Sequence, residues 1–237
     1  MILDKLNLNT QDREKILAAE RATEFVESGM VVGLGTGSTV FFAINKLSKL
    51  IKTGLDFKAV STSDVTTELA QSLGIKLVSI DDVHEIDITI DGADEADRSF
   101  NGIKGGGGAL LFEKIVALSS KVNIWIIDSE KLVDKLGKFP LPLEVIPFGY
   151  KRVFERLKTM NLNPELRKKG NELFFTDNGN YIIDLQLKEI DDPDKWDSEF
   201  KLVTGIVETG LFINIPDKII VGRHDSVEIL CKTKSNT

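Results

Sequence analysis

The chain is poor in the side chains on which metal and thiol chemistry most often depends. Its 237 residues include one cysteine, Cys231, and two histidines, His84 and His224. One cysteine cannot close a disulfide within the chain, and the three side chains together are too few for a typical zinc site. Zinc chemistry is therefore close to excluded, and we expect surface or structural roles for both histidines.

Long apolar runs and an excess of positive charge are also missing. No run of about 18 apolar residues occurs, and residues 1–15 are polar where a signal peptide would be basic and then apolar. Thirty Lys and Arg residues stand against 37 Asp and Glu residues, and the formal net charge of −7 repels the phosphates of nucleic acids. We expect a cytoplasmic protein whose partners include neither nucleic acid nor a membrane.

In the first 135 residues, segments whose apolar residues have helical spacing alternate with segments whose pattern is typical of strands. A helical pattern runs from Thr10, which we expect to cap it, toward Gly29, and residues 30–35 predict a strand. Further strands are expected at 76–80 and at 86–91, where isoleucine alternates with polar residues. Strands that alternate with helices predict an α/β fold with a mostly parallel sheet and helices on both faces.

A second unit is expected after a proline-rich segment. Residues 137–150 hold three of the chain's six prolines, which indicates a hinge. Two apolar runs flank Asn178-Gly179, and this pair predicts a hairpin with a type I′ turn, in which both central residues need positive φ. We therefore expect a Rossmann-like domain of residues 1–135 with 208–237, and a smaller antiparallel α+β domain of residues 136–207.

A loop rich in glycine and hydroxyl groups follows the first predicted strand, with the sequence Gly33-Leu34-Gly35-Thr36-Gly37-Ser38-Thr39. Glycines let backbone amides approach an anion, hydroxyls add donors, and the helix that follows presents its positive end. The spacing differs from the dinucleotide fingerprint, which requires glycine where Ser38 stands, and the P-loop lysine is missing. We favour a phosphorylated ligand over the alternative, a plain tight turn.

A cluster of acids follows a later strand, in the sequence Asp91-Gly92-Ala93-Asp94-Glu95. Ligands of parallel α/β sheets bind beyond the carboxyl ends of the strands, so we expect this cluster at the same edge as the glycine loop. Neighbouring carboxyl groups can differ in protonation and act as an acid and a base, or they can bind Mg²⁺. A solvated acidic turn is the other interpretation.

Four consecutive glycines follow Lys104, and the helix after them carries Glu113. Ordering such a run is costly in entropy, so a folded domain rarely keeps it unless something must approach the backbone closely. Lys104 and the exposed amides suit an oxyanion or a phosphate, and Glu113 is placed to act as a base. A flexible surface loop is the alternative. The three segments together are most compatible with proton transfer on a phosphorylated carbonyl compound.

Several motifs resemble, in their order and near their spacing, those of the ribose-5-phosphate isomerase A family, the cofactor-independent form of this enzyme. They are GLGTGST, STSD, DGADE, KGGGGAL, the pair Glu113-Lys114, LGKFPLPLEVIP and TDNGN, and the resemblance covers nearly the whole chain. The resemblance implies reversible interconversion of D-ribose 5-phosphate and D-ribulose 5-phosphate in the non-oxidative pentose phosphate pathway, with neither metal nor cofactor. It also implies a Rossmann-like domain, a smaller ferredoxin-like domain and a homodimer or homotetramer.

The resemblance assigns roles position by position. Glu113 matches the proton acceptor that moves a proton between C2 and C1 through a cis-enediol intermediate, and Asp91, Asp94 and Lys104 match groups around the sugar oxygens. Asp91 is our candidate for assisting ring opening. The matching substrate-binding positions are Thr36, Gly37, Ser38, Thr39, Asp91, Gly92, Ala93, Asp94, Lys104, Gly105, Gly106, Gly107 and Lys131, with Lys15 as a further basic residue near the phosphate.

Other functions are compatible with parts of the sequence. A coenzyme A transferase or a sugar-phosphate deaminase is expected to share the architecture of the first domain, but to lack the pairing of DGADE with KGGGG. A sugar-phosphate sensor without catalytic activity is a further alternative. Such a sensor normally carries a DNA-binding helix-turn-helix, and the residues before Met30 leave room for one helix.

Overall fold

The computed structural model describes residues 9–232 and divides into two compact units. Among the described residues, the first unit comprises 9–92, 115–132 and 215–232, and the second comprises 93–114 and 133–214. We describe each unit by itself. The outermost residues of the first predicted domain, 1–8 and 233–237, lie outside the described residues. No helix among the described residues is both long enough and apolar enough to cross a membrane.

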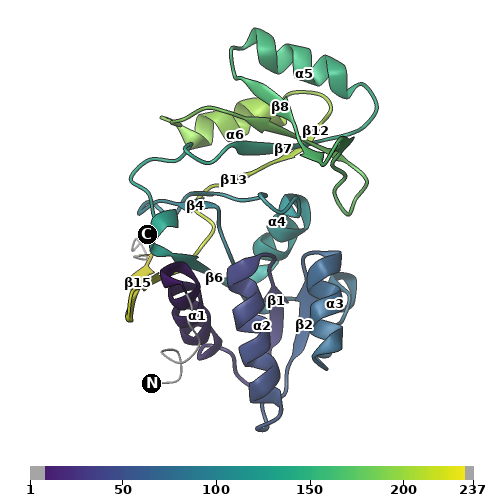
Figure 1. Cartoon of the computed structure of the whole chain (residues 1–237). Helices are drawn as coiled ribbons and strands as arrows, with labels where there is room; N and C mark the ends of the chain where they lie inside the picture. Colours follow the sequence, from purple (N-terminus) through teal and green to yellow (C-terminus); the bar gives the residue numbers. More distant parts are fainter. Residues whose placement is uncertain (1–8, 233–237) are drawn as a thin grey trace, which may run out of the picture. The chain divides into compact units, whose positions relative to one another are not determined.

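A six-stranded sheet forms the centre of the first unit (Figure 1). Its strands follow the order β15-β14-β6-β3-β1-β2, and every neighbouring pair is parallel except β14 with β15. The mostly parallel sheet expected from the sequence is therefore confirmed. The strands are β1 (Val31–Leu34), β2 (Lys58–Ser61), β3 (Ile86–Asp91), β6 (Ser120–Asp128), β14 (Lys218–Arg223) and β15 (Ser226–Cys231).

Small side chains allow the helices of the first unit to pack closely. These helices are α1 (Thr10–Thr23), α2 (Ser38–Ile51) and α3 (Asp64–Ser72), with the short turns η2 (Ile80–Asp82) and η3 (Ser129–Lys131). Ala18, Ala19 and Ala22 of α1 are fully buried in the same core as apolar residues of α2 and the sheet, which α1 contacts. Helix α1 ends at Thr23, earlier than expected, and Asn9 caps it in place of Thr10, because the Asn9 side chain accepts the Asp12 N–H.

The second unit contains a four-stranded antiparallel sheet with two helices. The strands follow the order β12-β7-β11-β8, and the chain runs β7-α5-β8-β11-α6-β12. This βαββαβ arrangement is the ferredoxin-like one implied by the family resemblance. The elements are β7 (Leu141–Val145), α5 (Tyr150–Thr159), β8 (Pro164–Leu166), β11 (Tyr181–Leu185), α6 (Pro193–Lys201) and β12 (Ile206–Thr209).

Shorter strands complete the second unit. A three-stranded sheet joins β4 (Glu95–Ala96), β5 (Gly102–Ile103) and β13 (Leu211–Phe212), and a two-stranded one joins β9 (Lys168–Lys169) and β10 (Glu172–Leu173). Helix α4 (Leu110–Leu118) begins in the second unit and ends in the first.

Two local predictions were wrong. Residues 76–80 form a single bridge, Leu77 with Ala59, where we expected a strand. The turn at Asn178-Gly179 is not of type I′, because Gly179 has φ 74° but Asn178 does not have positive φ. The runs on either side of this turn are joined by an antiparallel bridge between Phe175 and Tyr181 and by a hydrogen bond from the Thr176 N–H to the Asn180 carbonyl (2.9 Å), while β11 forms its ladders with β7 and β8.

The compact units differ from the predicted domains in three segments. Residues 93–114, 133–135 and 208–214 group with the second unit, whereas the sequence placed them in the first domain. Grouping by proximity does not test which segments fold together. The boundaries 1–135 with 208–237 and 136–207 therefore stay a prediction.

Candidate functional site

In the first unit, the loop after β1 is built against Asp91. The Gly35 N–H donates to the Ile90 carbonyl (3.0 Å), and a Cβ on residue 35 would overlap the Asp91 carboxylate. Asp91 is 1% exposed, and its Oδ1 accepts the N–H of Thr36 (3.2 Å) and that of Gly92 (2.7 Å). Glycine at position 35 therefore lets the loop approach the carboxylate at the end of β3, as required for both to serve one ligand.

The four residues Thr36 to Thr39 have different surroundings. The Thr36 hydroxyl lies within hydrogen-bond distance of the hydroxyls of Thr62 (2.8 Å), Ser63 (2.8 Å) and Thr66 (3.3 Å). Gly37, with φ 119°, precedes α2 without a side-chain cap, and both Gly37 and Ser38 are exposed. An uncapped helix N-terminus of this kind favours an anion. Thr39 is buried.

Sequence reasoning from the residues alone missed the hydroxyl cluster beneath Thr36. The Thr66 hydroxyl also donates to the Gly35 carbonyl (2.8 Å), and the Thr62 hydroxyl donates to the Leu34 carbonyl (3.2 Å). These hydrogen bonds fix the backbone of the loop that follows β1. The one signal for them is the STSD motif, which points to a site only through the family resemblance.

Lys131 lies in η3 and Lys15 in α1, and the Glu14 side chain connects these two elements. Both lysines are half-buried. Glu14 is 2% exposed, and its carboxylate accepts the backbone N–H of Ser129 and that of His224, each at 2.9 Å. Burial alone would raise the pKa of Glu14, but these donated N–H groups outweigh it and hold the pKa below the usual value.

In the second unit, Lys104 and Glu113 form a buried ion pair. The Lys104 Nζ lies 3.2 Å from a Glu113 carboxylate oxygen, and the two side chains are 3% and 5% exposed. Lys104 follows β5, and its ammonium also lies 5.4 Å from the centre of the Phe212 ring. Glu113 is in the first turn of α4, where its N–H donates to the Ala109 carbonyl. Lys104 thus places a fixed ammonium beside a buried carboxyl group, and a carboxylate in such a position can act as a base.

The glycine run after Lys104 forms a tight turn. The Gly108 N–H donates to the Gly105 carbonyl (2.9 Å), and both residues have positive φ, 106° at Gly105 and 83° at Gly108. Asp94 binds the same turn, because its Oδ2 accepts the Gly106 N–H at 2.7 Å. The turn is ordered by hydrogen bonds, in contrast to the alternative of a flexible loop.

The predicted acidic cluster separates into groups with different partners. Asp91 binds the β1 loop of the first unit and Asp94 binds the glycine turn of the second. Glu95 is 3% exposed and accepts the N–H groups of Gly137 (2.7 Å) and Phe139 (2.6 Å). Three carboxylates that each accept backbone N–H groups are no solvated acidic turn.

Metal binding by the acidic cluster gains no support from the side chains. Within residues 9–232, no three His, Cys, Asp or Glu residues are grouped so that they can hold a metal ion. The expected independence from metal stays a prediction that requires an assay.

Lys114 belongs to a motif with Glu113, but the sequence assigned it no role of its own. Its ammonium donates three hydrogen bonds of 2.8 Å, to the Glu208 carboxylate and to the carbonyls of Thr209 and Leu211. Burial lowers the pKa of Lys114 below its usual value, although the Glu208 carboxylate opposes this effect. These contacts fasten the first turns of α4, and with them Glu113, to β12 and β13.

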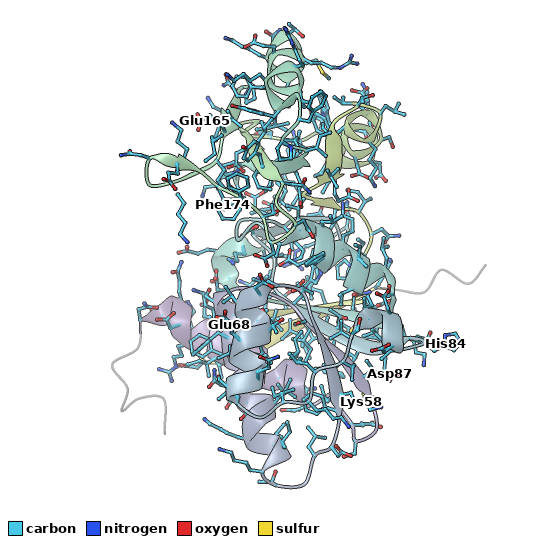
Figure 2. The ribbon with its side chains drawn as sticks, turned by 90° about the vertical axis from the view of Figure 1, so that its right-hand side faces the viewer. Lys58, Glu68, His84, Asp87, Glu165 and Phe174 are labelled. Carbon is cyan, nitrogen blue, oxygen red and sulfur yellow. The ribbon has the colours of Figure 1, made fainter. Side chains whose placement is uncertain are left out.

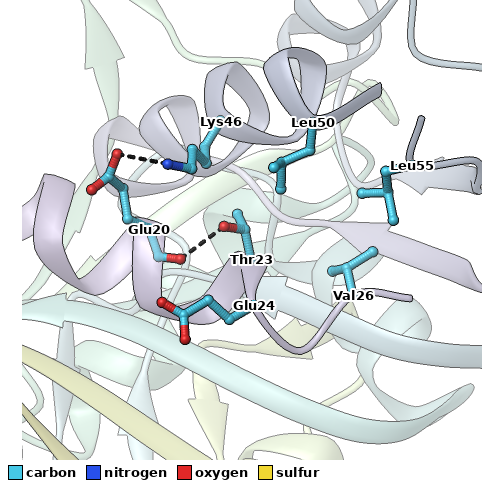
Figure 3. Close-up of a pocket in the computed structure, with 7 residues that line it drawn as sticks. All are labelled: Glu20, Thr23, Glu24, Val26, Lys46, Leu50 and Leu55. Atoms are coloured by element: carbon cyan, nitrogen blue, oxygen red, sulfur yellow. Dashed lines mark hydrogen bonds and ion pairs between the residues drawn. The ribbon is translucent and has the colours of Figure 1, made fainter. Parts of the chain in front are cut away.

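Two features lie apart from the predicted site residues. A hollow of about 330 Å³ beside α1 and α2 contains none of them (Figure 3). It is lined by Glu20, Thr23, Glu24, Val26, Lys46, Leu50 and Leu55. His84 is exposed in the turn before β3 (Figure 2), in agreement with the surface role expected for it.

Comparisons with known proteins agree with the motifs. Residues 58–226 match the family described as ribose 5-phosphate isomerase A (phosphoriboisomerase A). Relatives named ribose-5-phosphate isomerase A include one from Listeria monocytogenes, 51% identical over 92% of this chain and 99% of its own length. Another, from Streptococcus pneumoniae, is 51% identical over 93% of this chain and 97% of its own.

Solved structures also match. A D-ribose-5-phosphate isomerase in complex with phospho-erythronic acid has a TM-score of 0.91 and 41% identity, covering 95% of this chain and all of its own. The ribose 5-phosphate isomerase from Plasmodium falciparum has a TM-score of 0.90 and 39% identity, covering 94% of this chain and 99% of its own.

Proposed function

The chain belongs to the ribose 5-phosphate isomerase A family, and from this membership we propose how its own residues carry out the reaction. The protein is an aldose-ketose isomerase that interconverts D-ribose 5-phosphate and D-ribulose 5-phosphate. We therefore no longer keep the transferase, deaminase and sensor alternatives. The observation that carries the residue assignment is the buried Lys104–Glu113 pair at 3.2 Å, beside the glycine turn.

Glu113 is the proposed base. In the open-chain aldose, its carboxylate removes the proton from C2, and the electron pair of that C–H bond forms the C1=C2 double bond of a cis-enediolate while the carbonyl π electrons move onto O1. A proton binds O1, the O2 hydroxyl loses its proton, and Glu113 returns a proton to C1 to give the ketose. A carboxylate placed in this way contributes about 10² to 10⁴ in rate.

Lys104 is the proposed electrostatic partner of the intermediate. Proton removal moves negative charge from the Glu113 carboxylate onto the substrate oxygens, and the Lys104 ammonium already lies 3.2 Å from a carboxylate oxygen of that base. A fixed donor of this kind stabilises the transition state by about 2.7 to 4 kcal/mol. The hydrogen bonds that order the glycine turn support a second source of donors, its backbone N–H groups.

The remaining proposed roles concern ring opening and binding of the phosphate. Asp91 exchanges a proton with the ring oxygen or the anomeric hydroxyl, and Asp94 binds sugar hydroxyls. The exposed Gly37 and Ser38 at the uncapped start of α2 support phosphate binding by the loop Thr36 to Thr39. Lys131 and Lys15 supply positive charge near the phosphate.

The function is tested by a direct isomerase assay of the purified chain with EDTA present. We expect full conversion of ribose 5-phosphate to the equilibrium mixture, because no step requires a metal, and inhibition by phospho-erythronic acid, whose carboxylate resembles the enediolate in charge and planar shape. Lys104→Met is expected to lower kcat about 100-fold or more. Loss of wild-type activity in EDTA contradicts the metal-free mechanism, and full activity of Lys104→Met contradicts the role of this lysine.

Assembly and location are a further part of this proposal. We propose a cytoplasmic homodimer or homotetramer, as the family resemblance implies. Highly exposed apolar side chains in the second unit, among them Phe148 and Leu202, support association of copies of the chain. Light scattering during size-exclusion chromatography tests the assembly, and a monomer at micromolar concentration contradicts it.

A further inference from the structure

The carbonyl side of the glycine turn is held by one arginine. The Arg167 Nη1 donates to the Gly105 carbonyl at 2.7 Å and to the Gly106 carbonyl at 3.1 Å. These two carbonyls belong to consecutive peptide groups at the start of the turn. Arg167 stands between β8 and β9, 62 residues from Gly105 along the chain.

Arg167 is itself fixed in place. Its Nε donates to one carboxylate oxygen of Asp184 in β11 (2.8 Å), its Nη2 donates to the other, and the side chains are 14% and 16% exposed. A forked pair of this kind fixes the plane of the guanidinium. The ring of Phe174 (labelled in Figure 2) has its centre 5.8 Å from the guanidinium carbon. A Cβ on residue 108 would overlap this ring.

The contacts of Arg167 determine where the amides of the turn point. The chain has no cis peptide bonds, and in a trans peptide the N–H of one residue points opposite to the C=O of the residue before it. When Arg167 binds the carbonyls of Gly105 and Gly106, the N–H groups of Gly106 and Gly107 therefore point away from it. The Gly106 N–H meets Asp94, whereas the Gly107 N–H has no acceptor among residues 9–232 and Gly107 is exposed.

We propose that Arg167, held by Asp184, is a positioning residue that aims the Gly107 N–H at the developing oxyanion of the substrate. The inference rests on the proposed function, since it requires the glycine turn to bind the enediolate. Donors that are aimed before the reaction contribute most, because they need no reorganisation when the charge appears. Arg167 touches no reacting atom and acts only through the peptide groups of the turn.

The main test compares three variants of the arginine pairs in the full chain. Arg167→Met is expected to lower kcat about 100-fold, the size of effect expected when a donor to the oxyanion is lost or misplaced by about 1 Å, while KM changes less than threefold. Arg167→Lys supplies one donor without the fork and is expected to recover part of the rate. Arg223→Met, which breaks the Arg223–Glu228 pair (2.7 Å) far from the turn in sequence, is expected to leave kcat unchanged.

Binding of phospho-erythronic acid distinguishes positioning from folding. We expect Arg167→Met to bind this analogue at least tenfold more weakly, and free guanidinium at millimolar concentration to restore part of kcat. If Arg167→Met does not fold, as judged by circular dichroism, Asp184→Asn takes its place, because it frees the guanidinium without removing it. In either variant, a kcat within threefold of the wild type or unchanged binding of the analogue overturns the proposal.

The outcome separates this inference from the proposed function. An inactive Glu113→Gln variant together with a fully active Arg167→Met variant refutes only the positioning role. A fully active Glu113→Gln variant refutes the proposed function on which that role rests.

Discussion

Replacement of Lys114 by methionine tests how the helix that carries Glu113 is fastened. Methionine keeps most of the length and apolar stem of lysine but has no ammonium. The change removes three hydrogen bonds of 2.8 Å and leaves Glu208 and two backbone carbonyls, of Thr209 and Leu211, without their common donor. Lys114 is 4% exposed, so water reaches the site poorly and cannot replace that donor without rearrangement.

The expected loss of stability is large for one side chain. Removing one partner of a buried ion pair costs about 3 to 5 kcal/mol, because the other charge stays behind. For a protein of this length, about 1 kcal/mol shifts the midpoint of thermal unfolding by about 2 to 4 °C. We therefore expect Lys114→Met to lower that midpoint by about 6 to 20 °C.

Lys121→Met is the matched control. Lys121 pairs with two carboxylates, Glu85 at 2.7 Å and Asp87 at 3.0 Å, but its side chain is 50% exposed. Surface ion pairs contribute little to stability because solvent screens them, so this variant is expected to unfold close to the wild type. The assay is urea and thermal unfolding of both variants, followed by circular dichroism. A Lys114→Met variant within 1 kcal/mol of Lys121→Met would refute the argument from burial.

Two further changes test the supports of the first unit. Glu14→Gln is expected to cost about 2 kcal/mol at neutral pH, since one of the two charge-assisted hydrogen bonds that the Glu14 carboxylate accepts from backbone N–H groups is lost. The folded-state pKa of Glu14 is lowered from its usual value of 4.5, so the stability that Glu14 contributes is complete above that value and is lost as pH falls through the folded pKa. In urea unfolding from pH 7 to 3, the free energy of unfolding should therefore fall less steeply in Glu14→Gln than in the wild type. An identical decline would contradict this reasoning. Thr36→Val removes the hydroxyl that lies within hydrogen-bond distance of the Thr62 and Ser63 hydroxyls, and we expect it to raise the KM for ribose 5-phosphate. Thr36→Ser keeps a hydroxyl and is expected to restore the KM. An unchanged KM of Thr36→Val in steady-state kinetics would show that the hydroxyl cluster does not shape the loop.

Much of the architecture was predictable because it is encoded locally. Buried parallel strands appear as short apolar runs such as 30–35, and the helices between them have their own period, so the α/β sheet followed from the sequence alone. The turn at Asn178-Gly179 was predicted wrongly because the pair preference describes isolated two-residue hairpins. Here the Thr176 hydroxyl and the side-chain amides of Asn178 and Asn180 donate to the buried Glu144 carboxylate. The local sequence does not reveal these contacts.

The candidate site was predictable only where its residues stand in one short segment. The glycine loops, the acids and Glu113 each belong to a motif with its own chemistry. Lys114 and Arg167 were missed because their partners lie far along the chain, 94 residues away for Glu208 and 62 for Gly105. A lone lysine or arginine in a polar segment is usually a solvated side chain, and only the folded chain shows what it binds.

The most direct test of the central claim is the kcat of Glu113→Gln, measured beside Glu165→Gln as a control at an exposed glutamate of the same unit (Figure 2). Glutamine keeps the size and hydrogen-bonding ability of glutamate but cannot accept the C2 proton. We expect kcat to fall at least about 100-fold in Glu113→Gln alone, while phospho-erythronic acid binds with an affinity within a few-fold of the wild type. A Glu113→Gln variant that isomerises ribose 5-phosphate at more than a tenth of the wild-type rate would contradict the account.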